Sequence, residues 1–229
     1  MILSIVVPIY NEQLIIKNNI EKIYNYFSDK FDFEIIIVND GSIDDSLEII
    51  KNMNVKNLNI INNPYNLGKG NALKKGILNS KGEIVLVTDI DLSTSIDQFI
   101  TLHNKLSEGY DIVIGSRSTK EAKILRRKSI QRIIAGEIFN FCVKNILNLS
   151  FNDTQCGFKL FNGLAIRELI SHSFINRFCI DVEILFLAKK FNLKVNEIGI
   201  KWEHDMISSV RLFRDSINMF IDLLRIKFN

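Results

Sequence analysis

Short apolar, β-branched runs alternate with segments of helical periodicity over the first 117 residues. This alternation restricts the fold more than any other feature of the sequence. The runs lie at residues 3–9, 33–38, 58–61, 84–87 and 111–115. Such runs fit strands covered on both faces, and regular alternation with helices predicts right-handed crossovers. We therefore expect a doubly wound α/β fold with a mostly parallel sheet flanked by helices.

Polar side chains follow these runs directly, at what would be the carboxyl ends of the strands. Ligands of doubly wound sheets bind beyond those ends. The residues that we expect along this rim are Tyr10, Asp40, Asp89, Asp91 and Arg117.

The tripeptide Asp89-Ile90-Asp91 closes the apolar run 84–87. Two carboxylates two residues apart can hold Mg²⁺ or Mn²⁺, and such an ion can bridge a diphosphate. The alternative is a helix start, because Thr94 and Asp97 have the spacing of a capping box. That alternative explains the residues after the tripeptide and leaves Asp89 and Asp91 unexplained.

Two other residues of the rim have both a functional and an ordinary interpretation. Asp40 can accept hydrogen bonds from a base or ribose, or it can belong to the turn Asn39-Asp40-Gly41-Ser42. Lys69 lies near an expected helix amino terminus, where phosphates bind. The glycines around it match neither a dinucleotide fingerprint nor a P-loop.

Length and composition favour one domain inside the cell. The 229 residues are 47% hydrophobic and contain only two prolines and no low-complexity run, which argues against a flexible linker. The three scattered cysteines predict a reducing compartment. Met1 leads straight into a strand rather than a signal peptide, and no apolar stretch reaches the length of a membrane span. We expect a cytoplasmic protein.

Positive charge is concentrated in residues 117–132, which carry seven Lys or Arg and one Glu. The segment 120–147 combines this charge with isoleucines, as expected for a helix lying on an anionic membrane. An ordinary solvated helix face is the alternative. The C-terminal segment predicts a second amphipathic surface helix, with burial against the first half as its alternative. Nucleic acid is not an expected partner, since no binding module is present.

The motifs together resemble family 2 inverting glycosyltransferases of the GT-A fold, and among them the polyprenyl (dolichyl) phosphate glucosyltransferases. The motifs that carry the resemblance are Val7-Pro8-Ile9-Tyr10-Asn11-Glu12, Val38-Asn39-Asp40-Gly41-Ser42, Asn66-Leu67-Gly68-Lys69-Gly70, Asp89-Ile90-Asp91-Leu92-Ser93, Ile114-Gly115-Ser116-Arg117, Asp153-Thr154-Gln155-Cys156-Gly157-Phe158-Lys159-Leu160-Phe161 and Asp181-Val182-Glu183. The Asp153 to Phe161 run points to lipid-phosphate acceptors and to glucose over mannose.

The resemblance implies roles for individual residues. Those implied to hold the nucleoside are Pro8, Tyr10, Glu12 and Asp40. Asp89 and Asp91 would hold ribose, diphosphate and metal, and Arg117 would meet phosphate. It also implies a nucleotide-sugar half at 1–117 and an acceptor and membrane-facing half at 118–229. The eukaryotic relatives carry an N-terminal membrane anchor, in place of which we expect docking through amphipathic helices on the inner face of the membrane.

The acceptor decides which residues the chemistry needs. A sugar hydroxyl must lose a proton, so Asp153, Asp181 or Glu183 would serve as base. A phosphate monoester has its second pKa near about 6 and is already an anion at neutral pH. The basic residues Arg126, Arg127 and Arg132 suit such an acceptor. We expect glucose transfer from a UDP-sugar to polyprenyl phosphate, with catalysis by Asp91, Arg117, Asp153 and Asp181. The alternatives are a GDP-mannose-dependent enzyme, a transferase to a saccharide hydroxyl and a non-catalytic membrane-docking protein.

Overall fold

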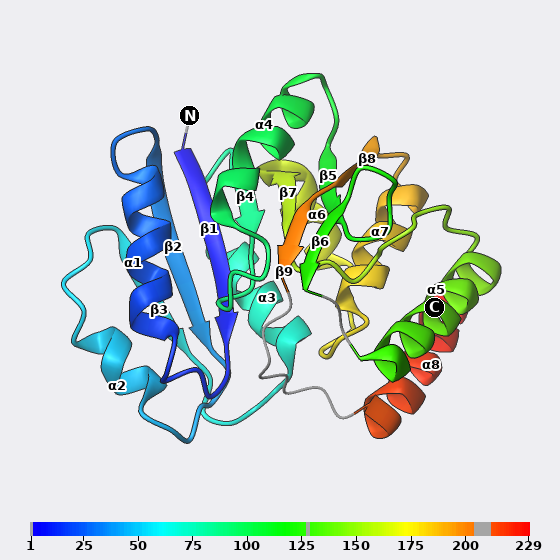
Figure 1. The fold of residues 1–229 in the computed structure, drawn as a ribbon, viewed down its shortest axis with the longest axis horizontal. Coiled ribbons are helices and arrows are strands. Elements are labelled where there is room, and N and C mark those ends of the chain that lie inside the picture. The colour runs from blue at the N-terminus through cyan, green and yellow to red at the C-terminus, as the bar shows by residue number, and fades with distance from the viewer. Residues whose placement is uncertain (1, 127–128, 204–211) are drawn as a thin grey trace.

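A central sheet organises the molecule. The computed structural model describes residues 2–126, 129–203 and 212–229. Within them, seven strands form one sheet in the order β3-β2-β1-β4-β7-β5-β8 (Figure 1). Their bounds are β1 (Ile2–Ile9), β2 (Asp32–Asn39), β3 (Leu58–Asn62), β4 (Ile84–Val87), β5 (Ile112–Ser116), β7 (Lys159–Asn162) and β8 (Val195–Gly199).

Most of the sheet is parallel, as expected. Strands β1 to β4 pair in parallel, as do β5 and β8. The exception is β7, which lies antiparallel between β4 and β5. Because β7 and β8 come from beyond residue 117, the two sequence halves build one sheet and share its core.

Helices cover both faces because successive side chains of a buried strand point to opposite sides. Ile5 and Val7 of β1 lie in one apolar core and Val6 lies in the other. The first core is closed by α1 (Ile16–Phe27), α2 (Ser46–Lys51), the 3-10 turn η1 (Ile96–Gln98) and α4 (Phe99–Ser107). The second is closed by α3 (Lys69–Leu78), α6 (Gly163–Ser171) and α7 (Ile180–Lys190).

Helices α5 (Ile130–Leu147) and α8 (Leu212–Phe228) pack side by side at the far end of this second layer (Figure 1). Val143 of α5 and Leu223 of α8 are fully buried in the same core as α7. Each helix is thus fixed by its inner face. No helix in the described ranges combines the length and the apolar character needed to span a membrane.

Two expectations about elements were wrong. Residues 120–147 do not form one long helix, because β6 (Lys123–Arg126) pairs with β9 (Lys201–Glu203) and α5 begins only at Ile130. The sequence from Lys194 to Trp202 predicts one final strand. In the structure this strand is split, since β8 joins the main sheet and β9 joins the small one. Both errors involve pairing between distant segments, since Lys123 pairs with Lys201 and Ile112 pairs with Val195. His204, which follows the expected final strand, and Ser208 and Ser209, either of which could cap the C-terminal helix, lie outside the described residues.

Candidate active site

One cavity of about 1130 Å³ opens at the carboxyl edge of the parallel strands. Its volume exceeds the usual range for a single drug-sized ligand, so a donor and an acceptor head group can occupy it together. All the residues expected along the rim line it, namely Tyr10, Asp40, Asp89, Asp91 and Arg117. Pro8, Glu12, Lys69, Asp153, Asp181 and Arg132 line it as well. The other walls come from α5, α8, the loops at 152–158 and 177–178, and Trp202.

Asp89 is paired with Lys69 across the cavity floor. The Lys69 Nζ lies 2.7 Å from the Asp89 Oδ1. Burial opposes both charges, but their attraction outweighs it, so the pKa of Asp89 lies below and that of Lys69 above the usual value. Lys69 is the first residue of α3, where the helix dipole also favours anions. A bound diphosphate would therefore meet a cation that is already in place.

Asp91 has no comparable cation. Its Oδ1 accepts a hydrogen bond of 2.9 Å from the Ser93 N–H. Burial, and then the negative charge of Asp89, raise the pKa of the Asp91 carboxyl. The expected alternative of a capping box is not observed, because Ser95 precedes η1 and makes no side-chain cap. The pair of aspartates thus carries more negative charge than Lys69 balances.

A divalent cation fits this excess of negative charge. The described residues contain no cluster of three or more His, Cys, Asp or Glu that could enclose an ion. Asp89 and Asp91 would therefore supply only part of a coordination shell. Mg²⁺ commonly binds in this way, through one or two carboxylates and the phosphates of its substrate.

Asp40 holds the loop that precedes α3. Its Oδ1 accepts from the Leu67 N–H at 3.0 Å, and its Oδ2 accepts from the Gly68 N–H at 2.8 Å. The Asn63 side chain donates a further bond to Oδ1 at 2.7 Å. Asp40 is 3% exposed. These bonds place Lys69 at the cavity while Asp40 itself lines the wall.

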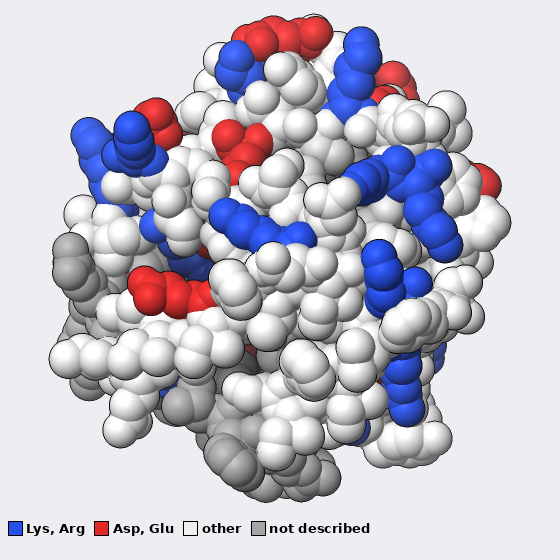
Figure 2. Space-filling view, turned by 90° about the vertical axis from the view of Figure 1, so that its right-hand side faces the viewer, with Lys and Arg blue, Asp and Glu red and all other residues white. Residues whose placement is uncertain are grey.

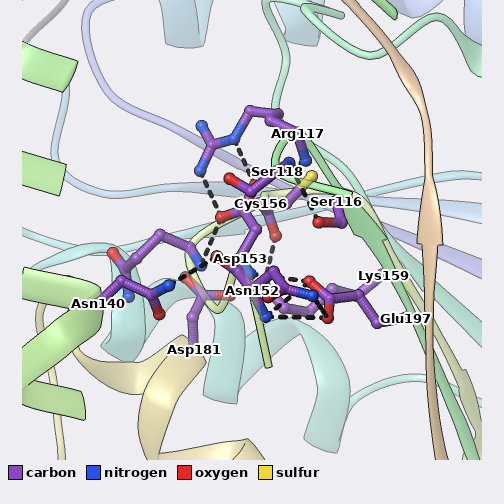
Figure 3. A network of polar contacts seen from close by, with 11 residues as sticks. Ser116, Arg117, Ser118, Asn140, Asn152, Asp153, Cys156, Lys159, Asp181 and Glu197 are labelled. Atoms are coloured by element: carbon purple, nitrogen blue, oxygen red, sulfur yellow. Dashed lines mark hydrogen bonds and ion pairs between the residues drawn. The ribbon is translucent and has the colours of Figure 1, made fainter. Parts of the chain in front are cut away.

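Arg117 and Asp153 form a second buried ion pair. The Arg117 Nε and Nη2 donate to the two Asp153 oxygens at 2.6 and 2.8 Å, and the Arg117 N–H donates at 2.9 Å (Figure 3). The guanidinium also lies 5.6 Å from the ring centre of Trp202. Burial alone would raise the pKa of Asp153, but the charge and hydrogen bonds of Arg117 lower it to about 2. Asp153 therefore stays ionised, and both of its carboxylate oxygens accept hydrogen bonds from Arg117.

Replacing Asp153 by Asn should flatten the acid limb of the stability profile. A carboxyl whose pKa falls on folding stabilises the protein above its unfolded pKa, and this contribution disappears as the pH falls through about 2. The shift is worth about 2 kcal/mol. Urea unfolding between about pH 5 and pH 2 should show a smaller pH dependence for Asp153→Asn than for the wild type. The exposed Asp29→Asn control should keep the wild-type slope, and equal slopes for all three proteins would contradict the assignment.

Lys159, the first residue of β7, is buried at the carboxyl end of β4 and forms an ion pair with Asp181. It stands opposite Val87 of β4 and Ile114 of β5. Its Nζ lies 2.5 Å from the Asp181 Oδ1 and also donates to the Cys156 carbonyl. The two side chains are 1% and 5% exposed. Figure 3 shows Asp181 on the first turn of α7, below Asp153.

Glu183, the third carboxylate expected as a possible base, has a structural role and accepts hydrogen bonds from the loop before α7. It is 1% exposed. One oxygen accepts from the Phe174 N–H at 2.9 Å, and the other accepts from the Ser173 hydroxyl and from the Ile175 N–H. These bonds tie the loop before α7, and Glu183 does not line the cavity.

Gly157 lies directly against the Asp89 carboxylate. A Cβ at position 157 would overlap all three carboxylate atoms of Asp89. We expect Gly157→Ala to displace Asp89 from Lys69 and to weaken the binding of UDP with Mn²⁺ about tenfold, since overpacking costs about 1–3 kcal/mol. Isothermal titration measures this affinity. Gly136→Ala is the control, because a Cβ there meets nothing within 4 Å. Unchanged affinity in Gly157→Ala would show that Asp89 does not bind the nucleotide.

The expected phosphate-binding cluster is only partly described. Arg132 lines the cavity from the first turn of α5. Arg126 ends β6, but its side chain is outside the described set, as is the whole of Arg127. The structure adds Arg177, an exposed side chain that lines the cavity and makes no hydrogen bond or salt bridge within the described residues. The sequence feature that could have indicated Arg177 is its position four residues before Asp181.

Comparison with known proteins decides the family. The model of glycosyl transferase family 2 matches residues 4–170, well over half of the chain. The chain belongs to glycosyl transferase family 2. The matched residues contain the Lys69–Asp89 and Arg117–Asp153 pairs, whereas Arg177, Asp181 and α8 lie beyond them.

Curated relatives align with almost the whole chain. The dolichyl-phosphate β-glucosyltransferase of Dictyostelium discoideum is 33% identical over 99% of this chain and 74% of its own length. The human dolichyl-phosphate β-glucosyltransferase is 30% identical over 98% of this chain and 74% of its own length.

A solved structure supports the fold. Glucosyl-3-phosphoglycerate synthase from Mycobacterium tuberculosis, in complex with Mn²⁺, UDP-glucose and phosphoglyceric acid, superposes with a TM-score of 0.69 at 18% identity. The match covers 98% of this chain and 79% of that one. It confirms that this family 2 chain has the GT-A fold.

Proposed function

We propose that the chain transfers glucose from UDP-glucose to a dolichyl-type polyprenyl phosphate at the cytoplasmic face of a membrane. The observation that carries the proposal is that each carboxylate suggested as a base is already occupied. Asp153 is bound by Arg117, Asp181 by Lys159 and Glu183 by backbone donors. An acceptor hydroxyl would need one of them free, whereas a phosphate monoester brings its own negative charge. The names of the curated relatives agree with this acceptor.

The two halves of the chain would bind different substrates. Residues 1–117 supply the rim that would hold the donor, with Pro8, Tyr10, Glu12 and Asp40 at the nucleoside and Lys69 at the diphosphate. Residues 118–229 supply Arg132, Arg177 and the helices α5 and α8 for the acceptor. Between them, Arg117 would stabilise phosphate charge from its fixed position on Asp153.

In the transfer, an oxygen of the acceptor phosphate attacks the anomeric carbon of glucose. The bond from that carbon to the diphosphate breaks on the opposite side, so the configuration inverts and UDP leaves. Lys69 and Arg117 offset the charge that the leaving diphosphate gains. A divalent ion on Asp89 and Asp91 would supply Lewis-acid stabilisation of the same charge. No proton has to be removed from the acceptor.

The decisive assay is transfer of radiolabelled sugar to polyprenyl phosphate in detergent with Mg²⁺ or Mn²⁺. UDP-glucose and GDP-mannose are tested in parallel, and a chloroform-soluble product from UDP-glucose is expected. If only GDP-mannose labels the lipid, the donor is GDP-mannose and not UDP-glucose. Slow hydrolysis of UDP-glucose without lipid labelling would reject the acceptor and favour transfer to a saccharide hydroxyl. Absence of nucleotide binding with Mn²⁺ would favour a non-catalytic protein.

Arg177 is predicted to hold the acceptor phosphate. Its side-chain Cγ lies beside Gly68 and its backbone carbonyl beside Gly70 at the start of α3, and its charge acts on Asp222 of α8. The side chain therefore lies between the donor rim and the acceptor helices. We expect Arg177→Ala to raise the KM for polyprenyl phosphate about tenfold or more, the worth of a hydrogen bond to a charged group. UDP affinity should not change.

Arg177→Lys is the matched variant, because it keeps the charge and loses the planar fork. It should retain part of the acceptor affinity. If Arg177→Ala weakens UDP and the lipid equally, the residue belongs to the donor site. If neither constant changes, it does not bind substrate.

A further inference from the structure

The outer face of α5 carries an apolar stripe that no described residue covers. Ile130, Ile134, Ile138 and Phe141 are 75%, 51%, 60% and 68% exposed. At 100° per residue these positions fall within an arc of about 80°. The buried Val143 and Leu147 lie on the opposite side of the helix. The stripe therefore points away from the core that holds α5 in place.

Helix α8 repeats the arrangement. The exposed large apolar side chains on it are Ile217, Phe220, Ile221, Leu224 and Phe228. They fall within an arc of about 100°. The buried Ile226 lies opposite this arc, and the buried Leu223 lies about 60° beyond its Phe220 edge. Arg225 and Lys227, both exposed, stand at the two edges of this stripe. An apolar stripe edged by basic residues is the pattern of helices that lie in the membrane interface.

The two stripes belong to one end of the molecule, because α5 and α8 pack side by side there (Figure 1). Figure 2 faces this end and shows broad areas without charge, with both basic and acidic side chains around them. Soluble monomers rarely expose so many large apolar side chains together. Asp222 of α8 is 13% exposed and paired with Arg225 at 3.3 Å.

The same helices form a wall of the cavity. Phe139 and Asn140 of α5, and Met219 of α8, line it with their inner faces. A surface that rests on a bilayer through the outer faces would hold the cavity beside the lipid head groups. We infer that the stripes of α5 and α8 together form a docking face that inserts into the interface of an anionic lipid bilayer. The inference rests on the proposed function, which places the acceptor in a membrane.

Flotation with vesicles tests the docking face without catalysis. The full chain is mixed with vesicles of phosphatidylcholine, with or without phosphatidylserine. We expect the wild type to float with the anionic vesicles. Ile134→Glu/Phe141→Glu on α5 and Ile221→Glu/Leu224→Glu on α8 should each lower the bound fraction about tenfold, since both place charge where apolar area is buried. Leu164→Glu is the matched control, because Leu164 is 77% exposed on α6.

Thermal unfolding and sedimentation velocity accompany the flotation, to establish that each variant is folded and to record its oligomeric state. A wild type that stays with the soluble fraction would overturn the inference, as would equal losses in Leu164→Glu. A wild-type dimer that the helix substitutions dissociate would also overturn it and assign the face to a second copy of the chain. Failure of glucose transfer with intact vesicle binding would reject the proposed function and leave the docking face standing.

Discussion

Replacing Asp91 by Asn is expected to lower glucose transfer by about 100- to 1000-fold, the usual cost of removing one group that stabilises charge in the transition state. Asn keeps the shape of the side chain and one acceptor oxygen, so the hydrogen bond from Ser93 can survive. What disappears is the negative charge that Lys69 leaves unbalanced, and with it the attraction for a divalent ion. The loss should fall on the metal-dependent part of donor binding and catalysis.

The measurement compares transfer and UDP affinity with and without Mn²⁺. In the wild type Mn²⁺ should strengthen UDP binding, and in Asp91→Asn that gain should vanish. Asp97→Asn is the matched control, because Asp97 is exposed a few residues further on and does not line the cavity. Wild-type turnover in Asp91→Asn would remove Asp91 from the metal site.

Replacing Lys159 by Met should destabilise the fold by about 3–5 kcal/mol, because it leaves the buried Asp181 carboxylate without its partner. Met fills a similar volume, so the expected loss is electrostatic rather than a cavity effect. Lys159 also donates to the Cys156 carbonyl, which would lose a hydrogen bond. Urea unfolding at neutral pH measures the change in the free energy of unfolding.

The double variant Lys159→Met/Asp181→Leu tests whether the loss of stability in Lys159→Met comes from the unpaired Asp181 carboxylate. Replacing both members of a buried ion pair by apolar groups is often neutral for stability. We therefore expect the double variant to recover most of the lost free energy. A loss in the double variant equal to the sum of both single losses would mean that the two side chains do not stabilise each other.

Several features follow from the sequence alone, because they depend on local pattern. The continuous apolar runs at 3–9, 33–38 and 84–87 predict strands that are buried on both faces. Their alternation with helices predicts a parallel sheet, as observed. The carboxyl ends of parallel strands lie at the same edge of a sheet. This edge therefore brings together Tyr10, Asp40 and Asp89, which all line the cavity. The family followed from the motifs in the same way.

Other features required the tertiary structure. Nothing in the order of residues sets β7 antiparallel between β4 and β5, since the partners of a strand are chosen by contacts far along the chain. Strand β6 interrupts the expected long helix for the same reason, through its partner β9.

The state of the carboxylates was also decided in three dimensions. Asp153, Asp181 and Glu183 look alike in the sequence as possible bases. Only the fold brings Arg117 to Asp153, Lys159 to Asp181 and the loop before α7 to Glu183. Charge and availability of a buried group are set by its neighbours, which come from distant parts of the chain. The sequence determined the sheet and its rim, and the tertiary structure determined which groups on that rim are free to act.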